Sequence, residues 1–152
     1  MLFLSTFQNK IDKKGRISVP ATFRAALAKD TEFSGIIAYA SFINRCVEAC
    51  SIARIRKLSE RIETLDPFSE ERDAFATTIL GGSVQLPFDG EGRVMLPEHL
   101  IEVAGIAETA IFVGKGETFE IWEPAAFAEY SARARDIARE KRLRLRSEGA
   151  TQ

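Results

Sequence analysis

The sequence has few of the side chains from which metal sites and catalytic centres are usually built. Its 152 residues include one histidine, His99, and two cysteines, Cys46 and Cys50. A four-ligand zinc site would need a second pair of Cys or His residues, which the chain lacks. It also lacks a Ser-His-Asp candidate, a phosphate-binding glycine loop and a carboxylate cluster around a nucleophile. We therefore predict a protein that is not an enzyme, binds no small-molecule substrate and holds no metal or other cofactor.

Long apolar runs are also absent. No segment approaches the ~20 apolar residues that a membrane-spanning helix needs, and the start, MLFLSTFQNK, turns polar too soon for a secretory signal. Hydrophobic residues make up 45% and charged residues 28%, which is typical of a soluble globular protein. The two cysteines fit a reducing compartment as buried, unreactive thiols. We expect a cytoplasmic protein with no membrane partner.

The formal net charge of −1 conceals a strong separation of charge along the chain. Residues 1–30 contain six Lys or Arg and two Asp or Glu, and residues 133–146 contain seven basic and two acidic residues. The segment between them, residues 31–132, carries eight basic and 17 acidic residues. Local positive potential of this kind favours docking to a polyanion. A charged helix end that is simply solvated would show the same composition, so composition leaves both interpretations open.

An internal repeat is the most informative property of the sequence. The segment FQNKIDKKGRISVPATFRAAL near the start matches the later segment SVQLPFDGEGRVMLPEHLIEV. The alignment places Asp12, Gly15, Arg16 and Pro20 opposite Asp89, Gly92, Arg93 and Pro97. Both copies continue with two short apolar segments, GIIAY and CVEAC in the first and AIFVG and FEIW in the second, and then a helix. Each copy therefore predicts the order strand, turn, strand, short helix, strand, strand, helix.

Between the copies, apolar residues at three- and four-residue steps predict an amphipathic helix. These residues are Ile55, Leu58, Ile62 and Leu65. Asp66-Pro67 ends this helix, Ser69 can cap another one through about Leu80, and Gly81-Gly82 breaks the chain. We predict an α+β fold with repeats at residues 1–81 and 82–152. Four short strands leave open edges, so the two copies are expected to pair into one pseudo-twofold barrel.

The segments DKKGR and DGEGR predict two tight turns that display an arginine. Aspartate at the first position can accept backbone N–H bonds, and glycine three residues later adopts positive φ without strain. An arginine held at the sheet rim can bind phosphate or the O6 and N7 edge of guanine. The first turn adds Lys13 and Lys14, whereas the second has Glu91. Alternatively, each Asp and Arg simply pair with each other, or across the copies, to fix the barrel.

At these turns and their flanks the sequence resembles the MraZ family of bacterial regulators, whose members contain two SpoVT/AbrB-type repeats. The resemblance runs from Phe3 to about Tyr130 and includes the paired D-x-x-x-R motifs, the prolines after them, and the C-V-E and E-I-W strands. It implies a swapped-hairpin-like β-barrel, ring-shaped homo-oligomers and binding of repeated G-rich boxes in double-stranded promoter DNA. It further implies a nucleoid-associated transcription factor that controls its own cell-division and cell-wall operon.

The family's DNA-contacting motif transfers residue by residue to both turns. The resemblance implies DNA binding by Lys13, Lys14, Arg16 and Arg93, and places Asp12, Gly15, Asp89 and Gly92 as turn organisers. The basic stretch RARDIAREKRLRLR lies outside this motif and is expected to continue a helix from Pro124. The packed side of that helix is predicted to hold Phe127, Tyr130, Ala134 and Ile137. Its arginines either touch DNA or keep the helix end soluble.

A second class of function stays open on the sequence alone, namely an oligomeric antitoxin-like or protein-interaction module of the swapped-hairpin type. Such modules usually have one repeat and a disordered toxin-binding tail. Two intact repeats argue against this class, whereas the basic C-terminal stretch is compatible with it.

Overall fold

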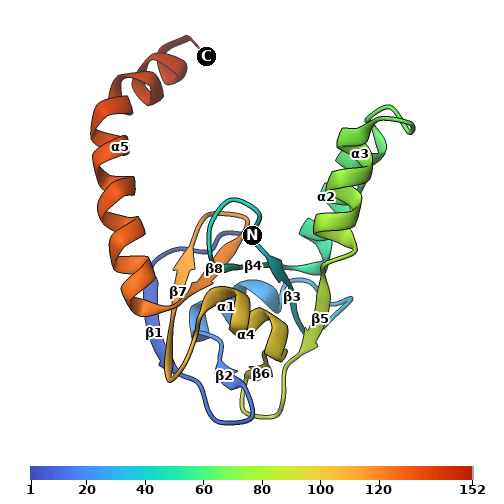
Figure 1. Cartoon of the computed structure of the whole chain (residues 1–152), viewed down its shortest axis with the longest axis vertical. Coiled ribbons are helices and arrows are strands. Elements are labelled where there is room, and N and C mark those ends of the chain that lie inside the picture. Colours follow the sequence, from blue (N-terminus) through green and yellow to red (C-terminus); the bar gives the residue numbers. More distant parts are fainter. Residues whose placement is uncertain (152) are drawn as a thin grey trace.

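The structure, a computed structural model, describes the backbone of residues 1–151 and the side chains of residues 1–146. Eight strands form a six-stranded antiparallel sheet, in the order β1-β7-β8-β4-β3-β5, and a two-stranded ribbon of β2 and β6 (Figure 1). The strands are β1 (Thr6–Lys10), β2 (Arg16–Ser18), β3 (Gly35–Ala40), β4 (Val47–Cys50), β5 (Val84–Pro87), β6 (Arg93–Met95), β7 (Thr109–Gly114) and β8 (Phe119–Trp122). The helices are α1 (Ala21–Leu27), α2 (Ile52–Glu63), α3 (Glu70–Phe75), the π-helix η1 (Ala76–Leu80), α4 (Glu98–Ala104) and α5 (Pro124–Thr151).

Strands from the two halves of the chain pair with each other in the sheet. β1 pairs with β7, and β5 pairs with β3, so the first strand of each half joins a hairpin of the other half. The central pair, β4 with β8, places Glu48 opposite Glu120. The order strand, strand, short helix, strand, strand, helix occurs in both halves, and the predicted mixture of helices and antiparallel strands is confirmed.

The predicted closed barrel is wrong for the part of the chain that the structure describes. β1 and β5 are the two edges of the sheet and do not pair with each other. β2 and β6 have three residues each and pair with one another, and the isolated bridge between Ile11 and Ile17 links β2 to the chain directly after β1. Strands this short close one end of the core as a cap and do not extend the sheet into a barrel.

The main core lies between one face of the sheet and a layer made of α1, α4 and the ribbon. Phe23 of α1 meets Phe3 and Phe119 with ring centroids 5.3 and 4.9 Å apart. Ile17 and Val94 of the ribbon are buried in the same cluster. Because strand side chains alternate between faces, the neighbours of Ile17 and Val94 point outward to solvent.

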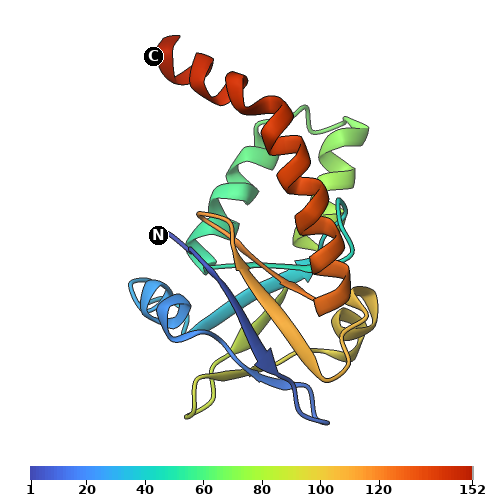
Figure 2. The same ribbon diagram turned by 90° about the vertical axis from the view of Figure 1, so that its left-hand side faces the viewer.

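The other face of the sheet carries two helical arms that point away from the ribbon (Figures 1 and 2). In the first arm Ile55 and Ile62 of α2 are buried and Leu58 packs beside Ile55, which confirms most of the predicted apolar stripe; α2 ends before Leu65. Ser69 caps α3 as predicted, since its hydroxyl accepts from the N–H of Arg72 at 3.2 Å.

The second arm is α5, which begins at Pro124 as predicted. It packs on the sheet through Tyr130, which stacks on Trp122 at 4.6 Å, and through Phe127. From residue 135 to residue 146 every side chain is exposed. The prediction that Ile137 is packed is therefore wrong: its exposed fraction is 57%, because the helix has left the sheet by that point.

Candidate nucleic-acid interface

The first Asp-x-x-Gly-Arg turn is organised by the carboxylate of Asp12. Its Oδ1 accepts the backbone N–H groups of Lys14 and Arg16, both at 2.9 Å, and its Oδ2 accepts Nε of Arg16 at 2.7 Å. The N–H of Asp12 donates to the carbonyl of Arg16 at 3.0 Å and closes the turn. The backbone N–H of Arg16 is the largest cause that holds the pKa of Asp12 below its usual value. One carboxylate thus sets both the backbone of the turn and the direction of the guanidinium.

The second turn repeats this geometry around Asp89. Its Oδ1 accepts the N–H groups of Glu91 and Arg93 at 2.8 and 3.0 Å, and its Oδ2 accepts Nε of Arg93 at 2.9 Å. The backbone N–H of Arg93 is again the main cause that lowers the pKa of the aspartate. The sequence difference between DKKGR and DGEGR therefore leaves the shape of the turn unchanged.

Two glycines allow the turns to lock onto each other's strands. Gly15 and Gly92 have φ of +87° and +76°, a left-handed conformation that favours glycine. The N–H of Leu96 donates to the carbonyl of Gly15 at 2.8 Å, and the N–H of Val19 donates to that of Gly92 at 3.2 Å. These bonds tie each turn to the strand that follows the other turn, so the two turns form one rigid end of the molecule.

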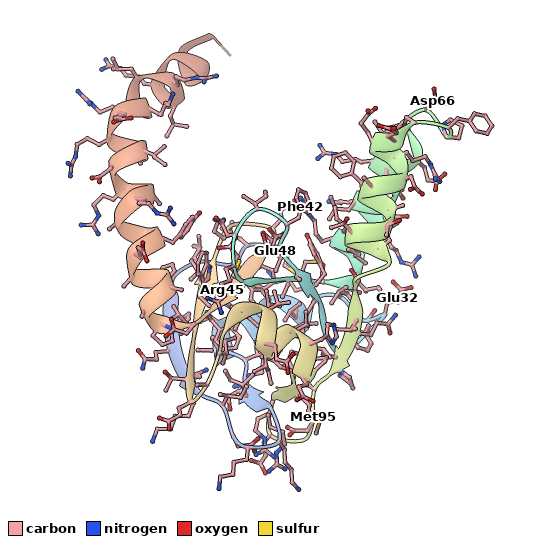
Figure 3. The ribbon with its side chains drawn as sticks, viewed as in Figure 1. Glu32, Phe42, Arg45, Glu48, Asp66 and Met95 are labelled. Atoms are coloured by element: carbon pink, nitrogen blue, oxygen red, sulfur yellow. The ribbon has the colours of Figure 1, made fainter. Side chains whose placement is uncertain are left out.

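The ribbon places both turn arginines on its outer face. Ile17 and Val94 point into the core, whereas Arg16 lies opposite Met95, and Arg93 lies opposite Ser18. Figure 3 shows Met95 at the end of the molecule opposite the arms. Its side chain, at the end of β6, is 55% exposed. The outer face therefore combines two cations with an apolar group.

The two turn arginines differ in the number of acidic side chains that lie near their guanidinium groups. Arg16 uses Nε for Asp12, and within the described residues its terminal nitrogens have no ion-pair or hydrogen-bond partner. Arg93 also pairs through Nε, but its Nη2 lies 3.7 Å from the Glu91 carboxylate. The internal Asp–Arg pair and an outward-facing guanidinium edge thus coexist in the first turn. In the second turn, Glu91 competes for the outward edge.

Arg24 stands beside the second turn, and the sequence reasoning did not single it out. Its Nε donates to the carbonyl of Val19 at 3.0 Å, and its guanidinium lies against Gly92, where a Cβ would come within 2.4 Å of Nη1. The matching position in the other half is Ile101, which packs against Gly15. The alignment of the two copies contains a signal for it, because it places the cation of Arg24 opposite Ile101.

The remaining groups considered from the sequence lie apart from this interface. Cys46 and Cys50 are buried, and burial raises the pKa of each thiol to about 12. His99 is exposed on α4. Among the described residues no group of three or more His, Cys, Asp or Glu side chains is placed to hold a metal ion. None of the helices, as far as the structure describes them, has the length and hydropathy to cross a membrane.

Comparison with known proteins relates the whole chain to one family. Residues 2–42 and 79–147, which include both turns, match the family described as "MraZ protein, putative antitoxin-like". A relative from Rickettsia bellii (strain OSU 85-389), named "Transcriptional regulator MraZ", is 59% identical over 147 residues, which are 96% of this chain and 97% of the relative. Relatives of the same name from Rickettsia africae (strain ESF-5) and Rickettsia canadensis (strain McKiel) are each 58% identical over 146 residues, with the same coverage.

Proposed function

The chain belongs to the MraZ family of transcriptional regulators, and we propose that it acts by binding double-stranded promoter DNA through the two Asp-x-x-Gly-Arg turns. The observation that supports this proposal most is the position and pairing of the Arg16 guanidinium. Its guanidinium is fixed by Asp12 along one edge, and its terminal nitrogens face outward without a partner in the described part of the chain. Lys13 and Lys14 are exposed in the same turn.

In the proposed complex the ribbon end enters the major groove, which is wide enough for a two-stranded β-ribbon. Arg16 and Arg93 read guanine through O6 and N7, because a guanidinium held in one direction can make this bidentate contact without losing rotamer freedom on binding. Lys13 and Lys14 bind phosphates and set the register. In the second turn, Arg24 supplies the positive charge that Gly90 and Glu91 do not.

Several weak contacts become a tight site when they are connected. We propose that copies of the chain form a ring-shaped homo-oligomer whose turns engage repeated G-rich boxes together, because each further contact is then intramolecular. The proposed boxes lie upstream of the protein's own cell-division and cell-wall operon, which would place it on the nucleoid in the cytoplasm. The exchange of β1 and β5 between the halves supports two SpoVT/AbrB-type repeats, residues 1–81 and 82–152, in one swapped-hairpin body.

A gel-shift experiment with DNA from upstream of the protein's own coding sequence tests the proposal. Arg16→Ala removes one bidentate contact, so the affinity for this DNA should fall about 10- to 100-fold. The matched control is Arg56→Ala, which removes an exposed arginine from α2 on the far side of the sheet and breaks only a surface ion pair with Glu32. Size and thermal stability should be unchanged in both variants. Normal binding by Arg16→Ala would refute the role of the turn.

A second candidate function is an antitoxin-like protein-interaction module, because the matching family description includes the words "antitoxin-like". This function predicts a folded protein that does not discriminate its own upstream DNA from unrelated DNA of equal length. The same gel-shift experiment, with an unrelated duplex added, separates the two candidates.

A further inference from the structure

The two arms of the molecule carry opposite charge. We call residues 59–75, at the outer end of α2 and in α3, the acidic arm; it contains six acidic and two basic residues. The acidic side chains are all exposed: Glu60, Glu63, Asp66, Glu70, Glu71 and Asp73. We call residues 133–146 of α5 the basic arm; it contains seven basic and two acidic residues, all of them exposed. Both arms project from the same face of the sheet, and Asp66 marks the tip of the acidic arm (Figure 3).

Ion pairs between residues of the same arm leave the net charge of that arm unchanged. In the acidic arm Glu63 pairs with Arg72, and in the basic arm Arg139 lies 3.9 Å from Asp136. Each arm therefore keeps an excess of one sign along its length. Opposite potentials of similar size on two surfaces favour their association and fix its orientation.

Exposed apolar side chains accompany the charges on both arms. Phe68 at the tip of the acidic arm is 95% exposed, and Leu143 and Leu145 in the basic arm are 61% and 79% exposed. A partner that covers these side chains would remove apolar surface from water, which is favourable.

We propose that the basic arm of one copy of this chain docks against the acidic arm of a second copy. A second copy fits better than DNA for two reasons. DNA held by the turns lies at the opposite end of the molecule from the basic arm (Figure 1), and phosphates offer no partner for the exposed leucines. The acidic arm supplies both the opposite charge and an apolar side chain.

This contact is heterologous, since each copy gives one arm of each kind, so repetition produces a closed ring or an open filament. It leaves all the turns free on the side of the assembly that faces away from the arms. The inference rests on the proposed function and deepens it by naming the interface of the homo-oligomer; its test requires self-association and no DNA.

A charge-swap experiment on the full chain without DNA tests the interface. The acidic-arm variant carries Glu60→Lys, Glu70→Lys and Glu71→Lys, and the basic-arm variant carries Arg135→Glu, Arg139→Glu and Arg142→Glu. In each variant the two arms carry charge of the same sign and repel the arms of other copies. Light scattering at low salt should therefore give the molar mass of a monomer. An equimolar mixture offers arms of opposite sign again and should regain the wild-type size. Wild type should dissociate as salt is raised, because exposed charges are screened.

The control replaces the same three arginines with lysine, which keeps the charge and should assemble like wild type. Circular dichroism verifies that every variant is folded. If both charge-swap variants keep the wild-type size, or if their mixture stays dissociated, the arms are not the interface although the homo-oligomer stands. A wild type that is a single chain under all conditions would overturn both. A basic-arm variant that keeps its size but loses DNA would assign that arm to DNA.

Discussion

Replacing Gly15 by alanine is the most direct test of the idea that the turns are locked onto each other's strands. A Cβ at Gly15 would lie 2.7 Å from the carbonyl oxygen of Leu96, and the N–H of Leu96 donates to Gly15. That oxygen is part of the ribbon backbone and cannot retreat without disturbing β6. At Gly92 the nearest atom to an added Cβ is Nη1 of Arg24, the far end of a flexible side chain.

The cost of each substitution can be worked from this geometry. Holding a residue with a Cβ in the left-handed conformation costs about 1–2 kcal/mol, and both glycines have positive φ. Pushing a Cβ into a tightly packed, fixed neighbour adds about 1–3 kcal/mol. Gly15→Ala should therefore lose about 2–5 kcal/mol of unfolding free energy. Gly92→Ala should lose less, about 1–3 kcal/mol, because Arg24 can swing aside at the cost of its hydrogen bond to Val19.

Urea unfolding followed by circular dichroism measures both losses, at one fixed protein concentration because self-association adds to apparent stability. Gly90→Ala is the matched control from the same turn, since an added Cβ there meets no atom within 4 Å and the residue lacks positive φ. It should change stability by less than about 0.5 kcal/mol. Equal losses for Gly15→Ala and Gly92→Ala would refute the locked-ribbon reasoning, as would a control that loses as much as either.

Three further predictions concern the charges and thiols. Lys13→Ala combined with Lys14→Ala should reduce the slope of log affinity against log salt by roughly two for DNA of any sequence, and an unchanged slope would place the phosphate contacts elsewhere. Ionised turn aspartates stabilise the fold fully above the ordinary pKa of 3.8, and this stabilisation is lost as pH falls through their lower folded pKa. Carbon-13 NMR titration of both carboxyls should therefore give midpoints below 3.8, and higher midpoints would contradict the turn geometry. A thiol-disulfide reagent near neutral pH should modify neither cysteine until the chain is denatured, because burial raises the pKa of each thiol to about 12; fast labelling of the native protein would be the contrary result.

The turns could be predicted from sequence because their chemistry is local. The Asp12 carboxylate binds groups within four residues, and the positive φ of Gly15 belongs to the same turn, so spacing alone indicates both. The contact of Arg24 with Gly92 could not be predicted in this way, since it joins segments that meet only in the folded sheet. The same applies to Ile137: its apolar spacing continues past the point where α5 leaves the sheet.

The predicted barrel was wrong for a related reason. Alternation within a strand indicates which side chains face the core, but it does not indicate which strands become neighbours. Whether a sheet closes depends on long-range pairing at its edges, here β1 and β5. The hydrophobic periodicity of a strand does not indicate which other strand will pair with its edge.

The exchange of first strands between the halves also governs when the molecule can form. Thr6 lies opposite Val113, so the strand that pairs with β1 is made only after most of the chain has left the ribosome. Contacts between residues so far apart in sequence stabilise the fold only after the entropy cost of closing a long loop has been met. Folding is therefore expected to be slow compared with helical proteins of the same size. The turn in DKKGR is synthesised early, yet the strand that locks it arrives with residues 93–95. A half-made chain therefore lacks the rigid end, and both turns become competent together.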